Sequence, residues 1–153
     1  MRYEIELKPR AIRDLKSLDR TMARRIVEKL AGMQDNLAGD VKRLTNSTPE
    51  FRLRVGDYRV LFEIEDNKVL VYRVRHRKDA YSKGDDMIEL HPQIVTKDGE
   101  KQFVILPYDE FAAIQEALAD IDDLNSLRTA KGEEHDAPTV PLEEVIDSLG
   151  LSG

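Results

Sequence analysis

Apolar and polar residues alternate over the first seven positions of the chain, with Tyr3, Ile5 and Leu7 on one side. This alternation is typical of a strand that is buried on one face. The apolar positions then change to helical spacing over residues 9–18 and again over residues 19–33. Two helices joined this closely predict an antiparallel helix hairpin.

Three later segments alternate in the same way, over residues 51–55, 58–65 and 69–75. Residues 56–57 and 66–67 separate them and have the composition of hairpin turns. Residues 38–50 are rich in Gly, Asn, Ser, Thr and Pro, and we expect a loop there. These elements predict an α+β fold, in which the helix hairpin packs on one face of a curved, mainly antiparallel four-stranded sheet.

A short polar segment, residues 82–86, divides the chain into two halves. The elements expected beyond it are two ribbon strands, a long amphipathic helix and a short C-terminal helix, at residues 88–95, 102–106, 107–131 and 141–149. A two-stranded ribbon and a helix have too little to bury by themselves. The expected organisation is therefore a domain over residues 1–81, a linker, and a segment over residues 87–153 that needs a partner.

The composition excludes several classes of site. The sequence contains no cysteine, so disulfides and thiolate metal sites are ruled out, and its three histidines lack metal-ligand spacing. No apolar run approaches the ~20 residues that a membrane-spanning helix needs, and no signal peptide opens the chain. We therefore expect a cytoplasmic protein with no metal, no other cofactor and no membrane partner.

The net charge of −6 conceals a strong asymmetry between the two halves. Residues 1–83 carry 20 Lys and Arg against 13 Asp and Glu, a net charge of +7. Residues 84–153 carry 4 against 17, a net charge of −13. Such a division indicates a part that faces nucleic acid and an acidic part, and opposite charge favours their docking on each other.

Strand parity gathers arginines on one face of the predicted sheet. They are Arg52, Arg54, Arg59, Arg73, Arg75 and, if the last strand stays regular that far, Arg77. Because the helices take the opposite face, these side chains should point into solvent or toward a partner. Guanidinium groups bind phosphates, and several of them could stabilise the transition state of phosphodiester cleavage. The alternative is a solvated face whose arginines pair with acidic residues.

Two stretches of the first half resemble the RelE branch of the RelE/ParE toxin superfamily. They are residues 51–62, FRLRVGDYRVLF, and residues 74–81, VRHRKDAY. The resemblance covers residues 1–81, including the order of strand, helix hairpin and three strands. It implies a toxin that cleaves messenger RNA on the ribosome, in the decoding site, by attack of a ribose 2′-hydroxyl on the adjacent phosphate.

The resemblance also implies roles for individual residues. Arg52 and Arg54 stand where the family has basic residues, usually lysines. Arg59 matches an arginine that contacts the scissile phosphate, and Arg77 matches one proposed to assist the leaving group. Tyr81 matches a C-terminal tyrosine that stacks on or orients the nucleotide.

The identity of the general base remains open at the level of sequence. Arginine effectively cannot lose its proton, so Arg52 and Arg54 should not act as the base. Tyr81 or His76 could take that role, and His76 has a suitable intrinsic pKa. However, regular alternation puts His76 on the core side with Tyr72 and Val74, and it would need a bulge to reach the basic face.

The second half resembles an antitoxin of the Phd/YefM type, on residues 94–99, IVTKDG, and residues 103–111, FVILPYDEF, with the long helix after them. The resemblance implies that this half inhibits the toxin. The helix stripe expected to cover the toxin is Phe111, Ile114, Leu118 and Ile121. The antitoxin segment that docks on the toxin domain could belong to the same chain or to a second chain. Operator DNA is a further partner that the resemblance implies, although the charge of −13 argues against it.

Two other functions are compatible with the same fold. One is a ParE-like toxin that binds and inhibits gyrase without cleaving RNA. The other is a catalytically inactive pair kept as a DNA-binding autoregulator. The arginine cluster favours the nuclease, because a gyrase-binding protein does not need it.

Overall fold

A computed structural model describes residues 2–45, 50–76 and 90–151. Its strands are β1 (Glu4–Leu7), β2 (Asp40–Arg43), β3 (Glu50–Val55), β4 (Tyr58–Glu65), β5 (Lys68–His76), β6 (Gln93–Lys97), β7 (Glu100–Ile105) and β8 (Val140–Pro141). Its helices are α1 (Pro9–Lys16), α2 (Arg20–Gly32), α3 (Tyr108–Glu134) and α4 (Leu142–Ser148). The fold is mixed α+β, as the sequence predicts.

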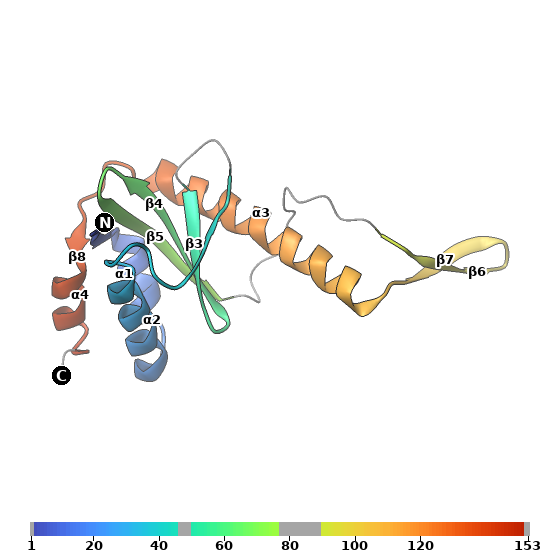
Figure 1. Ribbon diagram of the computed structural model, residues 1–153, viewed down its shortest axis with the longest axis horizontal. Helices are drawn as coiled ribbons and strands as arrows, with labels where there is room; N and C mark the ends of the chain where they lie inside the picture. The colour runs from blue at the N-terminus through green and yellow to red at the C-terminus, as the bar shows by residue number, and fades with distance from the viewer. Residues whose placement is uncertain (1, 46–49, 77–89, 152–153) are drawn as a thin grey trace.

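The helix hairpin forms where the spacing of apolar residues predicts it. Pro9 occupies the first turn of α1, and the side chain of Asp19 caps α2 by accepting a hydrogen bond from the backbone N–H of Met22 at 2.8 Å. Both helices pack on one face of the sheet, and their buried side chains join those of β1, β3, β4 and β5 in the main core. Figure 1 shows this hairpin on one side of the sheet.

The sheet is larger than the sequence predicts. In the described residues it has six strands in the order β2-β3-β4-β5-β1-β8, and β1 pairs with β5 in parallel while the other pairings are antiparallel. The prediction of a loop over residues 38–50 is therefore wrong at β2, which pairs with β3. This strand contains Val41 as its one large apolar residue, so its polar sequence gives no alternation and only the pairing defines it.

The second half of the chain contacts the sheet in two places, through α3 on one face and through β8 at the edge beside β1. The long helix α3 covers the face opposite the hairpin, where Leu127 and Ala130 pack on Leu61 and Tyr72 in a small second core. The ribbon of β6 and β7 forms a sheet of its own, which stands clear of the rest of the fold at the far end of α3 (Figure 1). Residues after α3 then return to the first half, where β8 extends the sheet at β1.

The C-terminal helix α4 completes the main core. Leu142 and Val145 are fully buried there, and Leu151 adds a third side chain after the helix ends. Pro141 precedes the helix without a side-chain cap. Thr139, which the sequence suggests as the cap, instead donates a hydrogen bond to Glu6 on β1. The first half therefore depends on the last residues of the chain for part of its hydrophobic core.

This shared core leads to a prediction for stability. Leu142→Ala should lower the free energy of unfolding of the whole chain by about 2–5 kcal/mol, because it leaves a cavity in a fully buried site. Urea unfolding followed by circular dichroism measures the change. Glu144→Ala, on the exposed face of the same helix, is the matched control and should have little effect. Equal stabilities for both variants would mean that α4 does not belong to the core.

Candidate functional site

The arginines of the sheet gather on the face that α3 covers. Arg52 and Arg54 lie on β3, Arg59 on β4 and Arg75 on β5. The strand register places Arg54 beside Arg59, and Arg59 beside Arg75. These four residues, called the arginine face below, lie together as strand parity predicts. They meet a partner rather than open solvent, because α3 lies over them.

Glu116 of α3 binds three of these guanidinium groups at once. Its carboxylate accepts hydrogen bonds from Arg52 at 3.2 Å, from Arg59 at 3.3 Å and from Arg54. Partial burial opposes ionisation of Glu116, but the guanidiniums of Arg54, Arg59 and Arg52 outweigh it and lower the pKa of this carboxyl group. Glu116 is therefore held as a carboxylate at the centre of three positive charges.

Asp120 and Asp123 continue the contact along the same side of α3. Arg59 Nη1 donates to Asp123 Oδ2 at 2.8 Å and lies 3.5 Å from Asp120 Oδ1. Arg52 Nε lies 3.6 Å from the same oxygen of Asp120. The spacing of positions 116, 120 and 123 is that of one helix face, so the three carboxylates reach the sheet together.

The ion pairs of this cluster are deeply buried. Arg52, Arg59 and Asp123 are 3%, 2% and 0% exposed. Atoms buried without a hydrogen-bond partner among the described residues are Arg52 Nε and Nη1, Arg59 Nε, Asp120 Oδ1 and Asp123 Oδ1. Burial of charges costs free energy that their attraction offsets only when the geometry is good, and removal of one partner leaves an uncompensated charge. The cluster therefore fixes which face of α3 meets the sheet, and it is sensitive to any single change.

In the later turns of α3 the charges are reversed, since the helix supplies the cations and the sheet supplies the carboxylates. Lys131 Nζ lies 2.7 Å from the carboxylate of Glu63, and Arg128 lies 3.3 Å from that of Glu50. Tyr72 donates its hydroxyl to Glu63 at 3.0 Å, and burial together with that carboxylate raises the pKa of Tyr72. The order of charges along the helix, acidic and then basic, mirrors the order on the sheet. A shift of the helix by one turn would separate Asp123 and Lys131 from the charges with which they pair.

A hollow of about 480 Å³ remains at the margin of the covered face, between β5, α1 and the later turns of α3. Arg75 donates to Asp122 at 3.0 Å and to Ser126 of α3. Arg73 lines the hollow but donates to Asp14 of α1 at 2.8 Å. Arg73 therefore adjoins the arginine face without pairing to the carboxylates of α3 described above.

A bulge in β5 places Tyr72 on the face of the sheet opposite to the one that regular alternation predicts. The register of β4 with β5 shifts between Leu61 and Phe62, which pair with Arg73 and Val71 and leave Tyr72 as an extra residue. Tyr72 therefore packs in the second core under α3 and not on the core side with Val74. Regular alternation along the sequence does not reveal the bulge, because the extra residue reverses the face to which each later side chain of β5 points.

His76 does not join the arginine face. It pairs with Tyr58 across the strands, and the two rings meet edge to face with centroids 4.9 Å apart. Tyr58 packs against the main core, as does Val74, which precedes His76 by two residues on the same side of β5. The bulge lies before Val74 and does not turn His76 toward Arg59. The geometry therefore favours packing as the role of His76 over that of a general base.

Arg77 and Tyr81, the remaining candidate catalytic residues, lie outside the described residues, as does the linker at residues 82–86. Their expected roles remain predictions.

The apolar stripe of α3 does not provide the contact expected of it. Phe111 is 46% exposed, and Ile114, Leu118 and Ile121 are half-buried. The helix presents its other side to the sheet, with Glu116, Asp120, Asp123, Leu127 and Ala130. Leu118 lies two residues from both Glu116 and Asp120, which puts it on the opposite side of a helix with 3.6 residues per turn. The buried ion pairs explain why the more polar side faces inward.

The buried carboxylates predict an unusual dependence of stability on pH. Burial raises the pKa of Asp123 from 3.8 to about 6, despite the opposing effect of Arg59. Asp123 therefore binds a proton more tightly when α3 is docked, and stability should rise as the pH falls from 7 toward 5. Glu116 has a lowered pKa and acts in the opposite direction, so stability should fall again once the pH drops below its ordinary value of 4.5.

Urea unfolding at a series of pH values tests this prediction. The wild-type chain should be most stable near pH 5, and Asp123→Asn should remove the rise between pH 7 and 5, since the amide cannot titrate. An equal rise in both proteins would assign it to another group. A steady decline of wild-type stability below pH 7 would contradict the raised pKa of Asp123.

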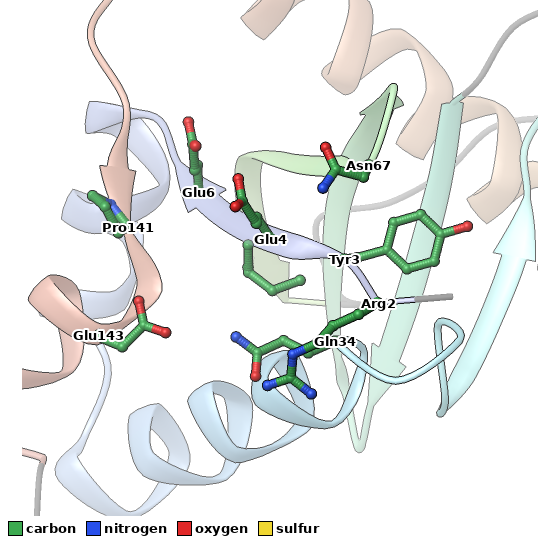
Figure 2. Close-up of a pocket in the computed structure, with 9 residues that line it drawn as sticks. Arg2, Tyr3, Glu4, Glu6, Gln34, Asn67, Pro141 and Glu143 are labelled. Carbon is green, nitrogen blue, oxygen red and sulfur yellow. The ribbon is translucent and has the colours of Figure 1, made fainter.

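A second hollow is separate from the arginine face. A second hollow of about 480 Å³ lies where β8 stops pairing with β1 and α4 begins, away from the arginine face (Figure 2). Glu4, Glu6 and Glu143 contribute carboxylates to it, and Arg2 contributes one guanidinium. No group of three His, Cys, Asp or Glu in the described residues could hold a metal ion. None of the described helices is long and apolar enough to cross a membrane.

Comparisons with solved structures find toxins in complex with their antitoxins. The RelBE2 toxin–antitoxin complex of Mycobacterium tuberculosis has a chain that is 28% identical, with 50% of this chain and 100% of that one covered and a TM-score of 0.45. A RelB–RelE complex of Methanococcus jannaschii gives 27% identity, coverage of 48% and 91%, and a TM-score of 0.43.

Comparisons of sequence identify the family of the first half. A curated protein of Methanocaldococcus jannaschii, called putative toxin RelE1, is 26% identical over 87 residues, which are 53% of this chain and 97% of that protein. The sequence model of the ParE toxin of the type II toxin–antitoxin system parDE matches residues 5–81. Because this model matches half of the chain, the protein belongs to the ParE toxin family of type II toxin–antitoxin systems.

Proposed function

We propose that this chain is a toxin held inactive by its own second half. One observation carries the proposal: Glu116, Asp120 and Asp123 of α3 pair with Arg52, Arg54 and Arg59, the basic residues expected to bind the target. A ligand that needs these guanidiniums cannot reach them while α3 is docked. The second half would thus act as an antitoxin in cis, the role that its resemblance to the Phd/YefM type implies.

The target favoured by the arginine face is RNA. Three guanidiniums that share one carboxylate can share one phosphate in the same way, because both ligands offer several anionic oxygens to planar donors. Glu116 would then stand in for the phosphate of a bound nucleotide. The negative charges of a phosphodiester backbone would replace those of Asp120 and Asp123 when α3 leaves.

The proposed reaction is cleavage of messenger RNA on the ribosome. The 2′-hydroxyl forms a bond to the adjacent phosphorus and loses its proton, while the bond to the 5′-oxygen breaks and that oxygen gains a proton. Arg59 would stabilise the charge that develops on the phosphate oxygens, with Arg52 and Arg54 holding the phosphate in place. Arg77 would assist the leaving oxygen, and Tyr81 would orient the nucleotide or act as the base.

Inhibition of gyrase is the second candidate function. The description of the matched family, the ParE toxin of parDE, favours it. A ParE-like toxin would act by binding alone and would not need guanidiniums that converge on one anion. The arginine face therefore favours the nuclease, and the two functions differ in a measurable product.

The test expresses residues 1–82 alone and as part of the full chain, and circular dichroism of the shorter chain checks that it folds without the core side chains of α4. Residues 1–82 should arrest growth and cut ribosome-bound messenger RNA, whereas the full chain should be far less toxic. The same preparation is assayed for inhibition of DNA supercoiling. Inhibited supercoiling without RNA cleavage would replace the nuclease with the gyrase inhibitor, and equal toxicity of both proteins would contradict inhibition in cis.

A further inference from the structure

The hollow between β5, α1 and the later turns of α3 is lined by both halves of the chain. The first half contributes three guanidinium groups, those of Arg10, Arg73 and Arg75. The second half contributes one carboxylate, that of Glu133, and several neutral polar side chains. Three positive charges against one negative charge give the lining a net charge of +2. A positively charged hollow of about 480 Å³ lies within the size range of small-molecule sites.

Arg73 keeps hydrogen-bond donors that the described residues do not use. Its Nε donates to Asp14 at 2.8 Å, and the same carboxylate oxygen accepts the backbone N–H of Val74 at 2.9 Å. These two bonds fix the guanidinium against β5, while its two terminal amino groups form no hydrogen bond with the described residues. A guanidinium that is held in place and keeps unused donors is preorganised to bind an anion.

The wall of the hollow on α3 adds neutral donors. Asn125 and Thr129 are exposed, lie one turn apart on the helix, and form no side-chain hydrogen bond with the described residues. Arg75 donates to Asp122 and Ser126 of α3 and therefore contributes positive charge held in a fixed position. None of the described residues that line the hollow is aromatic, so the lining does not favour a nucleobase, which needs a ring for stacking.

We propose that this hollow binds the phosphate group of a small molecule, either inorganic phosphate or a sugar phosphate. Arg73 and Arg10 would donate to the phosphate oxygens, and the hydroxyl of Thr129 would add a third donor. Arg10 is accessible for this role, because its ion pair with Glu133 at 3.0 Å joins side chains that are 38% and 53% exposed. An exposed ion pair contributes little stability, so the phosphate would replace Glu133 as the partner of Arg10.

A phosphate bound in the hollow would stabilise the docking of α3, because its ligands come from both halves. A compound that binds only the docked state favours that state by a factor that grows with its concentration, and the factor is ~100 at 100 times the Kd. The consequence for toxicity rests on the proposed inhibition in cis, under which the bound phosphate would keep the toxin inactive. The binding itself does not depend on that proposal.

The test titrates the full chain with inorganic phosphate and, separately, with ribose 5-phosphate in a calorimeter at constant ionic strength. The wild-type chain should bind at one site per chain, and its thermal midpoint should rise with the concentration of the ligand. Tighter binding of ribose 5-phosphate would identify a sugar phosphate as the ligand, and equal binding would show that the phosphate group alone is recognised.

Two arginines of α1 provide a matched pair of variants. Arg10→Gln removes a charged donor from the hollow and should weaken binding by ~10-fold or more. Arg13→Gln should leave the affinity unchanged, because Arg13 also pairs with the last turn of α3, at Glu134, but does not line the hollow. Arg73→Gln is a second test variant and should bind at least as weakly as Arg10→Gln, with circular dichroism as the check on its fold.

Three results would overturn the proposal. They are a folded wild-type chain that binds neither compound at millimolar concentrations, equal affinities of the Arg10→Gln and Arg13→Gln variants, and a thermal midpoint that rises equally with sodium chloride at the same ionic strength. Because calorimetry measures binding and not toxicity, a failure here would leave the proposed inhibition in cis untouched. Binding by a chain that proves harmless in both forms would in turn leave this site standing without the toxin.

Discussion

Replacing Asp120 and Asp123 with lysine should convert the full chain from a tolerated protein into one that arrests growth. The two lysines would face Arg52 and Arg59, which are buried within 4 Å of these carboxylates in the native chain. Removal of one partner from a buried ion pair costs about 3–5 kcal/mol, and reversal of its charge adds repulsion. The helix should leave the sheet and expose the arginine face. Growth after induction of the variant is the measurement.

The matched control for this variant is Asp136→Lys. Asp136 belongs to the same acidic half, but its side chain is fully exposed and pairs only with the neighbouring His135 in the contacts described here. This control changes the net charge without touching the arginine face and should leave the chain tolerated. If both variants arrest growth, net charge and not the docking of α3 controls toxicity. If neither does, the carboxylates of α3 do not restrain the toxin.

Arg59→Ala should abolish most of the activity that the lysine variant releases. Arg59 is the arginine that binds Glu116, Asp120 and Asp123 together, so it lies at the centre of the proposed phosphate site. Loss of one donor to a transition-state oxyanion typically lowers the rate by ~100-fold or more. The rate of cleavage of a translated message measures the effect, with the substitution made in the Asp120→Lys and Asp123→Lys background.

Arg2→Ala is the control for the loss of an arginine. Arg2 forms an exposed ion pair with Asp35 and is not part of the arginine face, so its removal should leave the cleavage rate unchanged. Circular dichroism of both proteins shows whether they remain folded. A folded Arg59→Ala variant with full activity would remove Arg59 from the site.

Much of the first half could be predicted from sequence because its signals are local. Alternation placed Arg52, Arg54 and Arg59 on one face, and the structure confirms that Phe51 and Leu53 lie on the other. Helical spacing and the cap at Asp19 defined the hairpin. The resemblance to the RelE/ParE superfamily is confirmed at the level of the family, while the RelE branch and the nuclease activity stay predictions.

The features that the sequence did not predict depend on pairing between distant segments. The strand β2 is recognisable only beside β3, and β8 only beside β1. The bulge at Tyr72 follows from the register of two strands, which one strand alone does not specify. In each case the local sequence is compatible with more than one backbone path, and tertiary contact selects among them.

The prediction of which side of α3 faces the sheet is wrong for a different reason. Apolar residues at helical spacing usually mark the buried side of a helix, so Phe111, Ile114, Leu118 and Ile121 were the natural choice. However, a sheet face that carries four arginines is a polar surface and selects carboxylates. Positions 116, 120 and 123 have helical spacing too, within an acidic half that follows a basic one. Matching this second stripe to the arginines of the strands would have predicted the contact.

Primer extension on a translated message tests the central claim most directly, because it reads RNA cleavage itself. The full chain and its Asp120→Lys, Asp123→Lys variant are added to translating ribosomes at equal concentrations. We predict new 5′ ends within the codons of the decoding site for the variant and none for the wild-type chain. Equal cleavage by both proteins would contradict inhibition by α3, and no cleavage by either would contradict the nuclease.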